Sequence, residues 1–421
     1  MNLEIRPSGS SPVHGDFAQV RWGNPGTPDS DVNSTVDAWL SELGDVSDRV
    51  VDLVRLASSA YIADRLRARG AGFSRTMRVH VHLTDSVAWT PLLGDVERIL
   101  GWVSGDKWEL SVSCETGTRT SNGQQRFVLD DDPPDAVSLL SGGLDSLSGA
   151  VLRRRPSLFL SHTDNPTVTG AQRRTWKWLT NNGVDGTCVR ISISEASRKR
   201  ESTTRTRALL FYALAVALAD ACHIGRVEVP ENGFTGLNLS FGNDRGGVLS
   251  TRSTHPWTMH LVQNLLDDAG IEVKLLNPYE WLTKGELVRA ALEVSAEFDL
   301  GLVTSLSCAK LDGRTYKGGN QNWNCGLCVA CLTRRAAIRM AGIQDKTPYL
   351  ATSLTGPALI QLQARRGLDV RAVTSRIDVE LDEFTLLEGG PYPGEFDLGA
   401  AVELCRRGFV ELAALMPELN L

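Results

Sequence analysis

The chain has 421 residues, of which 42% are hydrophobic and 22% are charged, and its formal net charge is −6. Such a chain has room for two or three globular domains, and its acidic balance disfavours nucleic acid as a partner. The apolar run 208–219 is too short to span a membrane, and the first residues lack a signal-peptide pattern. We therefore expect a cytoplasmic protein without membrane contact.

Residues 1–133 are interpreted as an N-terminal α+β extension. Residues 1–30 are rich in Gly, Pro, Ser and Asn, which favours an irregular lead-in. Apolar residues at helical spacing predict helices over 36–43 and 46–69. Alternating polar and apolar residues predict three strands, at 77–83, 108–114 and 125–129.

Two histidines, His80 and His82, share one face of the first of these strands. Histidines two residues apart on a strand can share a metal ion. Since no further ligand lies nearby in the sequence, we expect an exposed face without a metal.

Residues 130–135, with four acidic residues and two prolines, mark the boundary to a central region, residues 134–345. That region alternates predicted strands (136–140, 158–162, 187–193, 226–230 and 272–276) with predicted helices (145–154, 170–181, 204–222, 258–268 and 284–293). Alternation of this kind predicts an α/β fold, a doubly wound parallel sheet with helices on both faces. Ligands bind such sheets at the carboxyl ends of the strands. Ser141, His162, Glu231 and Pro278 follow strands there.

Residues 346–421 are interpreted as a helical and irregular C-terminal extension. Its last segment, from Leu398 to Leu415, has the apolar spacing of an amphipathic helix. The sequence assigns no chemistry to this region.

The segment Ser141-Gly142-Gly143-Leu144-Asp145-Ser146 joins the first central strand to a helix. A glycine turn at a helix N-terminus presents unpaired backbone N–H groups and can bind an anion. No Gly-Lys dipeptide occurs in the chain, which excludes a Walker-type loop, and Gly-x-Gly-x-x-Gly is absent here. The alternative interpretation is an ordinary Gly-Gly turn capped by Asp or Ser.

Four cysteines have the spacing of a metal site: Cys325, Cys328 and Cys331 form Cys-x2-Cys-x2-Cys, and Cys308 lies upstream. Four thiolates suit a closed, structural Zn²⁺ site. An iron–sulfur cluster and free thiols remain alternatives.

The pattern SGGxDS resembles the PP-loop of the N-type ATP pyrophosphatases, and its combination with CGLCxxC resembles the QueC family of 7-cyano-7-deazaguanine synthases. The resemblance covers residues 134–342 and includes the segments Thr206–Phe211, Leu276–Tyr279 and Thr283–Leu287. It implies an adenine-nucleotide-alpha-hydrolase-like (HUP) fold. Residues 230–256 depart from the family and resemble the QueC-like proteins of anti-phage operons, in particular the QatC group of the Qat system.

The resemblance implies roles for particular residues. It places ATP at the loop and two further residues: Ser141, Gly142, Gly143, Leu144, Asp145, Ser146, His162 and Arg205. It assigns catalysis to Asp145, which would also hold Mg²⁺, and to Ser146, Arg207 and Lys284. It assigns the substrate to Glu231, Asn232, Phe234, Arg252, Thr254 and His255. Alternatively, Arg207 and Lys284 are surface charges, and residues 230–256 are a Gly-rich loop without a binding role.

The resemblance also implies the reaction, an ATP-dependent ligation that releases AMP and pyrophosphate. A 7-deazaguanine-type carboxylate would be activated as an acyl-adenylate and passed to an amine of a partner protein from the same defence operon. Three alternatives stay open. They are a genuine 7-cyano-7-deazaguanine synthase that uses ammonia, an RNA-modifying PP-loop enzyme, and a nucleotide-binding scaffold without turnover.

Overall fold

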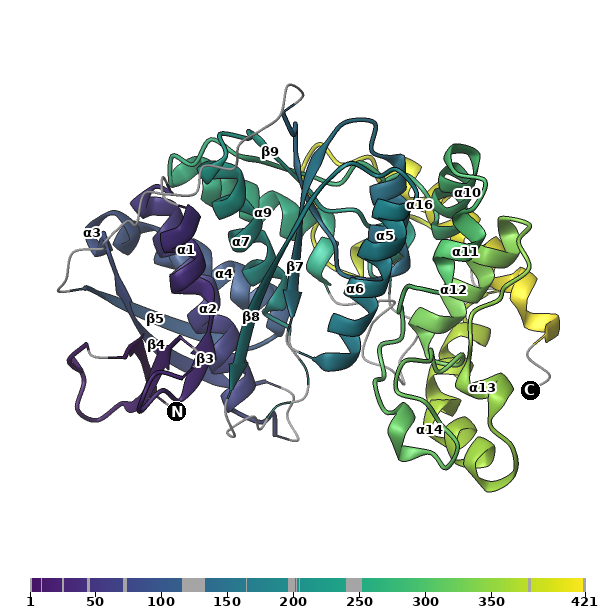
Figure 1. Cartoon of the computed structure of the whole chain (residues 1–421), viewed down its shortest axis with the longest axis horizontal. Helices are drawn as coiled ribbons and strands as arrows, with labels where there is room; N and C mark the ends of the chain where they lie inside the picture. Colours follow the sequence, from purple (N-terminus) through teal and green to yellow (C-terminus); the bar gives the residue numbers. More distant parts are fainter. Residues whose placement is uncertain are drawn as a thin grey trace.

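One ten-stranded sheet runs through the part of the chain that the structure describes (Figure 1). The computed structural model describes residues 2–418 apart from 9, 25, 44–45, 71–73, 116–132, 164, 196–200, 202, 204, 240–251 and 378–379. The strands are β1 (Asn2–Pro7), β2 (Ala18–Gly23), β3 (Val32–Ser34), β4 (Thr76–Leu83), β5 (Lys107–Cys114), β6 (Val137–Leu139), β7 (Ser157–Thr163), β8 (Gly186–Glu195), β9 (Arg226–Glu228) and β10 (Lys274–Leu276). They lie side by side in the order β10-β9-β6-β7-β8-β3-β2-β1-β4-β5.

The central half of the sheet, from β8 to β10, is parallel throughout. Its order corresponds to 3-2-1-4-5, so the prediction of a doubly wound sheet is confirmed. The helices of this half are α5 (Leu144–Leu152), α6 (Pro166–Asn181), α7 (Arg207–Ala221), α8 (Gly233–Gly236), α9 (Pro256–Asp268), α10 (Lys284–Val294) and α11 (Phe298–Leu302). The strand order reverses between β6 and β9, and a crevice opens at the carboxyl ends of strands at such a point.

The N-terminal half of the sheet is also parallel, and it joins the central half through the antiparallel pair β3–β8. Its helices are α1 (Val36–Leu43), α2 (Asp48–Leu66), α3 (Ser86–Trp89) and α4 (Leu93–Ser104), with a 3₁₀ turn at Thr90–Leu92. One hydrophobic core extends across both halves, from Leu3 and Val54 to Val137 and Leu214. The predicted boundary near residue 133 stays a prediction.

The irregular lead-in predicted for residues 1–30 is wrong, because this segment contains β1 and β2. Leu3 and Ile5 are buried in β1 together with the polar residue between them, and Val20 and Trp22 are buried alternately in β2. Each strand has so few apolar residues that the surrounding Gly, Pro and Ser dominated the local composition. The strands of this region pair in parallel with one another. The strand predicted at 125–129 lies outside the described residues.

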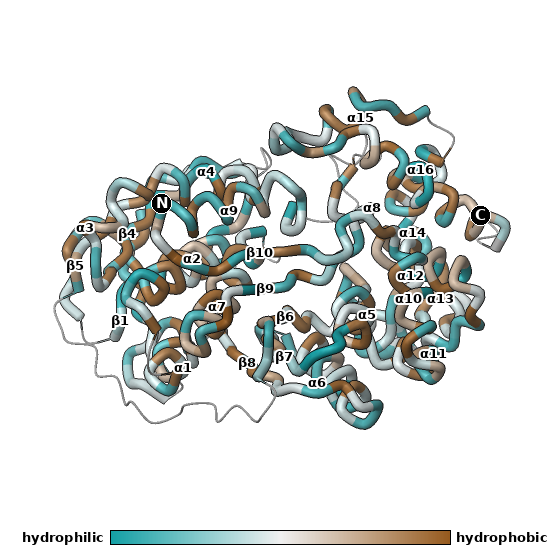
Figure 2. The backbone as a smooth tube through the Cα atoms, turned by 90° about the horizontal axis from the view of Figure 1, so that it is seen from above, coloured by the Kyte–Doolittle hydropathy of each residue, from teal (hydrophilic) through white to brown (hydrophobic). Residues whose placement is uncertain are grey.

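The C-terminal helices gather at the end of the molecule opposite β4 and β5 (Figures 1 and 2). They are α12 (Val329–Met340), α13 (Leu350–Ser353), α14 (Gly356–Thr374), α15 (Glu383–Leu387) and α16 (Leu398–Leu415). Further 3₁₀ turns lie at Arg252–Thr254, Gly313–Thr315 and Met416–Glu418. The amphipathic helix predicted at 398–415 is confirmed as α16. Across the described ranges, no helix combines the length and the apolarity needed to cross a membrane.

A buried charge network ties α2 to the start of α7. Asp64 is fully buried, and its Oδ1 accepts a hydrogen bond from Arg69 Nη2 at 3.1 Å and another from Arg75. Its Oδ2 accepts from the backbone N–H of Arg205 at 3.0 Å and from the Thr206 hydroxyl at 3.2 Å. Since Thr206 is the N-cap of α7, Asp64 fixes the position at which this helix begins.

We expect Asp64→Ala to lower the free energy of unfolding by about 3–5 kcal/mol, because buried guanidinium groups would lose a charged partner. The matched control is Asp267→Ala, which removes a surface ion pair with Lys274 and is expected to cost no more than about 1 kcal/mol. Equilibrium urea unfolding measures both. Equal losses in the two variants would contradict this role for Asp64.

Candidate functional site

The segment Ser141–Ser146 forms a tight turn between β6 and α5. Gly142 has a φ of +83°, and a Cβ at this position would lie 3.0 Å from the backbone nitrogen of Gln172. The Gly142 carbonyl accepts a hydrogen bond from Leu306 N–H at 2.8 Å, and the Ser146 hydroxyl donates to the Gly143 carbonyl at 3.1 Å. Glycine is therefore required at position 142, and the turn is anchored on two sides. The first N–H groups of α5 have no partner within the helix, and this helix start follows shortly after the end of β6.

Asp145 is at the centre of the site and is buried on the first turn of α5. Its Oδ2 pairs with Lys284 Nζ and accepts from Asn232 Nδ2 at 3.3 Å. Burial alone would raise the pKa of Asp145, but the Lys284 ammonium and hydrogen bonds from Glu231 and Asn232 lower it overall. Its Oδ1 is buried and has neither an N–H nor a hydroxyl donor among the described residues. This oxygen is available to a cation or to a shared proton.

Glu231 follows β9 and lies against Asp145, on the opposite side of the switch point from the glycine turn. Its Oε1 accepts from the Thr235 hydroxyl at 2.8 Å and from Asn232 Nδ2 at 3.1 Å. Burial and the adjacent Asp145 carboxylate raise the pKa of Glu231 well above its ordinary value. Two carboxyl groups in contact share one charge unless a cation joins them.

Two cavities adjoin at this carboxylate pair, and both are lined by Ser141, Pro230 and Glu231. The first has a volume of about 270 Å³, and its other lining side chains include Ser146, Arg205, Arg207, Tyr212 and Thr254. The second has a volume of about 230 Å³, and its lining includes Asp145, Lys284, Ser307 and Thr333. Cations line both cavities, Arg205 and Arg207 the first and Lys284 the second, so the pair can accommodate a two-part anionic ligand.

The start of α10, which carries Lys284, is held by a carboxylate from the C-terminal helix α16. Glu411 is buried and accepts hydrogen bonds from Gly285 N–H, at 3.0 Å to Oε2, and from the Thr283 hydroxyl. Thr283 and Glu286 form a capping box at the same helix start. A Cβ at position 285 would lie 2.4 Å from Glu411, so glycine permits this approach.

The structure brings together most of the predicted nucleotide and catalytic residues but only part of the predicted substrate set. Glu231 and Thr254 line the first cavity. Phe234 packs against Phe409 and Gly408 of α16, and Asn232 is the buried N-cap of α8. These two side chains therefore support the residues around the cavities and do not line them.

Three further predicted residues lie beside the cavities. Arg252 stacks on the Trp102 ring, with its guanidinium carbon 4.0 Å from the ring centroid. His255 is buried between the Trp102 and Tyr392 rings, and burial together with Arg252 lowers its pKa to about 3. His162 lies within β7, and its ring contacts Tyr61 and Phe211.

Sequence reasoning missed Asp64, Thr235 and Glu411. A signal exists for Glu411, because it occupies the buried stripe of α16 where an apolar residue is the ordinary choice. The same holds for Asp64, on a helix whose buried residues surround it. A charged residue at a core position of a helix indicates that a polar or charged partner from another segment packs against it.

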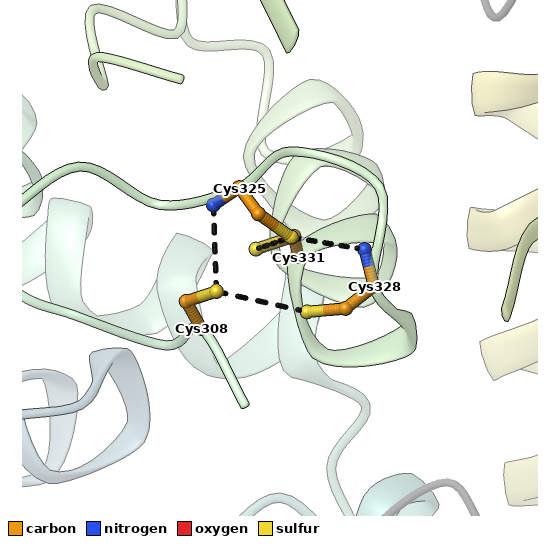
Figure 3. A group of neighbouring side chains, drawn as sticks. All are labelled: Cys308, Cys325, Cys328 and Cys331. Atoms are coloured by element: carbon orange, nitrogen blue, oxygen red, sulfur yellow. Dashed lines mark hydrogen bonds between the residues drawn. The ribbon is translucent and has the colours of Figure 1, made fainter. Parts of the chain in front are cut away.

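The four predicted cysteines converge at one point, and their sulfur atoms face one another (Figure 3). All four side chains are buried, and their four sulfur atoms lie within 4.8 Å of one another. Cys331 lies on the first turn of α12, as predicted, and Gly326 has a φ of +87° in the turn between Cys325 and Cys328. Backbone N–H groups point at the sulfurs, for example Cys328 N–H at 3.2 Å from Cys325 Sγ. The donor set fits a tetrahedral zinc ion.

The expected exposed face of His80 and His82 is wrong, because both side chains are buried. The His14 ring lies against His80 on this face, and on the neighbouring strand β1 Glu4 Oε1 lies 2.8 Å from His82 Nε2. Burial and the neighbouring His14 and His82 rings lower the pKa of His80 to about 4. The prediction failed because β1, which supplies Glu4, was taken as irregular.

We expect Glu411→Ala to lower the free energy of unfolding by about 1–3 kcal/mol, the cost of leaving a buried donor such as Gly285 N–H unsatisfied. Glu403→Ala, an exposed position on the same helix that pairs with Arg406, is the control and is expected to have little effect. Chemical denaturation compares the two variants. If Glu411→Ala is as stable as Glu403→Ala, the contact does not hold the helix start.

We expect Cys325→Ser to lower the zinc content by about one ion per chain, since a structural site needs four ligands. Cys114→Ser, at an exposed free thiol, serves as the control and should leave the metal content unchanged. Elemental analysis of the purified protein gives the zinc and iron contents. Iron and acid-labile sulfide in place of zinc would show an iron–sulfur cluster.

Part of the chain is similar to a known protein family. Residues 179–342 match the family QueC, described as "Queuosine biosynthesis protein QueC". That match includes Arg207, Glu231, Lys284 and the four cysteines, and it begins after the glycine turn.

Relatives named 7-cyano-7-deazaguanine synthase extend the comparison. The one from Xanthomonas campestris pv. campestris (strain B100) is 27% identical over 242 residues, which are 52% of this chain and 99% of the relative. The one from Ectopseudomonas mendocina is 25% identical and covers 51% of this chain and 97% of the relative. The one from Methanococcus maripaludis is 28% identical and covers 34% of this chain and 55% of the relative. Over about half of its length, the chain is QueC-like.

Proposed function

We propose that the chain is an ATP-dependent adenylating enzyme that activates a 7-deazaguanine-type carboxylic acid and releases pyrophosphate. The observation that carries the proposal is the meeting of the glycine turn, Asp145 and Lys284 at the switch point of the parallel sheet. The similarity to proteins named 7-cyano-7-deazaguanine synthase supports the substrate class. The two adjoining cavities offer one site for a nucleotide and a neighbouring site for the acid.

The proposed first step is attack of the substrate carboxylate oxygen on the α-phosphorus of ATP. A P–O bond to the substrate forms, the bond between the α-phosphorus and the bridging oxygen breaks, and pyrophosphate leaves with the bond electrons. Negative charge grows on the leaving group, so preorganised donors lower the barrier. In this proposal the donors are the N–H groups of the turn, the hydroxyls of Ser141 and Ser146, and the cations Arg207 and Lys284, whose side chains line the two cavities.

The residues fit two metal ions in different roles. Asp145 Oδ1, which is buried without an N–H or hydroxyl donor among the described residues, suits Mg²⁺, with the Glu231 carboxyl group beside it. Mg²⁺ bound there would neutralise charge on the triphosphate. The four cysteines suit a structural Zn²⁺, which would hold the start of α12 and so the position of Thr333 in the second cavity.

Glu231 is the candidate for recognising the substrate ring, because it reaches both cavities and its neighbour Thr254 lines the first. A carboxylate can accept hydrogen bonds from the ring N–H and the exocyclic amine of a guanine-like edge. Of the six residues expected to bind the substrate, Glu231 and Thr254 are the two that we assign to direct contact.

The proposed second step is capture of the acyl-adenylate by an amine of a partner protein from an anti-phage operon. A bond forms between the amine nitrogen and the acyl carbon, AMP leaves, and the nitrogen loses a proton to solvent. The residues outside the region shared with the relatives, about half of the chain, provide surface for such an acceptor. Ammonia as the acceptor is the second candidate, because the relatives named above carry the name of a nitrile synthase.

We expect pyrophosphate release from ATP that depends on 7-carboxy-7-deazaguanine. Lys284→Met should slow this release about 10²–10³-fold, the loss seen when one preorganised charge-stabilising group is removed. Lys274→Met, at an exposed lysine of β10, is the matched control and should keep the wild-type rate. Nucleotide binding without any release by the wild-type protein would favour a scaffold.

We expect the acceptor to be identified by intact-mass spectrometry of partner proteins co-expressed with the chain. A partner that gains the mass of the acid minus water, only when Lys284 is intact, supports transfer to protein. A 7-cyano product formed with ammonium and no change in any partner's mass would show a nitrile synthase. Labelling of added tRNA would show an RNA-modifying enzyme.

A further inference from the structure

Three metal-ligating side chains meet in the N-terminal half of the sheet, apart from both the cysteine cluster and the two cavities. Glu4 lies on β1, and His80 and His82 lie on β4. The two strands are paired in parallel, with Glu4 directly beside His80. All three side chains are buried, and one ligand atom of each lies within 4.8 Å of the others.

We propose that Glu4, His80 and His82 form a second metal site, which takes a divalent first-row transition-metal ion such as Zn²⁺. Two imidazole nitrogens and one carboxylate oxygen are a donor set for Zn²⁺ and its neighbours in the series. Ca²⁺ and Mg²⁺ require more oxygen ligands than this cluster supplies.

The backbone explains why these side chains converge. Residues two apart on a strand point to the same face, so His80 and His82 project together. The parallel register places Glu4 next to His80 on the neighbouring strand, and its carboxylate reaches His82. Buried ionisable groups are stable when they are paired or bound to a metal.

Outer contacts hold His80 and Glu4 in orientation, as such contacts do around metal sites. The hydroxyls of Ser111 and Ser113 on β5 lie 2.9 and 3.0 Å from the two ring nitrogens of His80. Glu4 Oε2 accepts from His14 N–H at 2.8 Å and from Gln19 Nε2 at 3.1 Å. One serine contact would keep the His80 ring in place while its other nitrogen binds the ion.

The ion would join β1 to β4 and, through Glu4, to the segment that crosses above them. Val13 N–H and His14 N–H both donate to the Glu4 carboxylate, and the His14 ring lies edge-on to His80 at 4.4 Å between centroids. We therefore assign this ion a structural role in fixing residues 13–17 against the sheet. The same side chains can also form a hydrogen-bonded network without a metal. Measuring the metal content distinguishes that network from a metal site.

The test is the metal content of the full-length protein, purified without a histidine tag, measured by elemental analysis beside the His82→Gln and Glu4→Gln variants. We expect the wild type to hold about one transition-metal ion per chain beyond the ion of the cysteine site, and each variant to lose it while keeping the other. His223→Gln, at an exposed histidine, is the control and should lose none. Cobalt substitution adds a spectroscopic check, because thiolate ligands give intense charge-transfer bands and the His–His–Glu site does not.

A second measurement covers the case in which a variant fails to fold. Anomalous X-ray scattering from crystals of the wild-type protein, grown after equilibration with Zn²⁺, is expected to show a peak between Glu4 and His82. The absence of that peak, or a wild-type metal content that Cys325→Ser removes entirely, would overturn the proposal and leave a metal-free network.

Discussion

Two buried carboxylates from opposite ends of the chain fix the two helices that carry the cations of the site. Asp64, from α2, accepts hydrogen bonds from Arg205 N–H and the Thr206 hydroxyl at the start of α7. Glu411, from α16, accepts from Gly285 N–H and the Thr283 hydroxyl at the start of α10. A helix start leaves donors that must be satisfied, and a buried acceptor for them is costly to lose. The directions of Arg207 and Lys284 therefore depend on α2 and α16.

The sheet topology brings these cations to the same place. The carboxyl ends of β6 and β9 flank the point at which the strand order reverses, and they carry the glycine turn and Glu231. Asp145 pairs with Lys284 across this point and lies against Glu231, which raises the pKa of Glu231. The N-terminal half continues the sheet through β3 and β8, so that α2 can pack on α7. Among the described residues, the N-terminal half of the sheet thus supports the site without lining the two cavities.

The sequence was sufficient to predict local features and insufficient for contacts between distant segments. Alternating strands and helices between residues 134 and 294 were predicted because their hydrophobic periods are regular. The cysteine cluster was predicted because its spacing is local. β1 and β2 were missed because each has few apolar residues, and such a short segment is recognisable as a strand only from its pairing with other strands. Glu4, Asp64 and Glu411 were missed because each depends on a partner more than seventy residues away, as the contacts Glu4–His82, Asp64–Arg205 and Glu411–Gly285 show.

The substrate-binding residues stay a prediction, and four of the six do not line the two cavities. Asn232 and Phe234 follow the end of β9, and His255 comes just before α9. Polar and aromatic residues between a strand and the next helix are typical of a pocket. In the structure they serve as an N-cap, a packing contact with α16 and a buried ring between two aromatic residues. A sequence pattern predicts that such residues gather at one edge of a sheet. Their orientation depends on contacts with distant segments, such as α16 and the rings of Trp102 and Tyr392.

Hydrogen–deuterium exchange of the full-length protein tests the central claim most directly, with Glu411→Gln and Asp64→Asn compared with the wild type. The account predicts faster exchange at residues 283–287 in the first variant and at residues 205–210 in the second, each without a change at the other helix start. Unchanged exchange at both helix starts would contradict it, because the carboxylates would then hold neither.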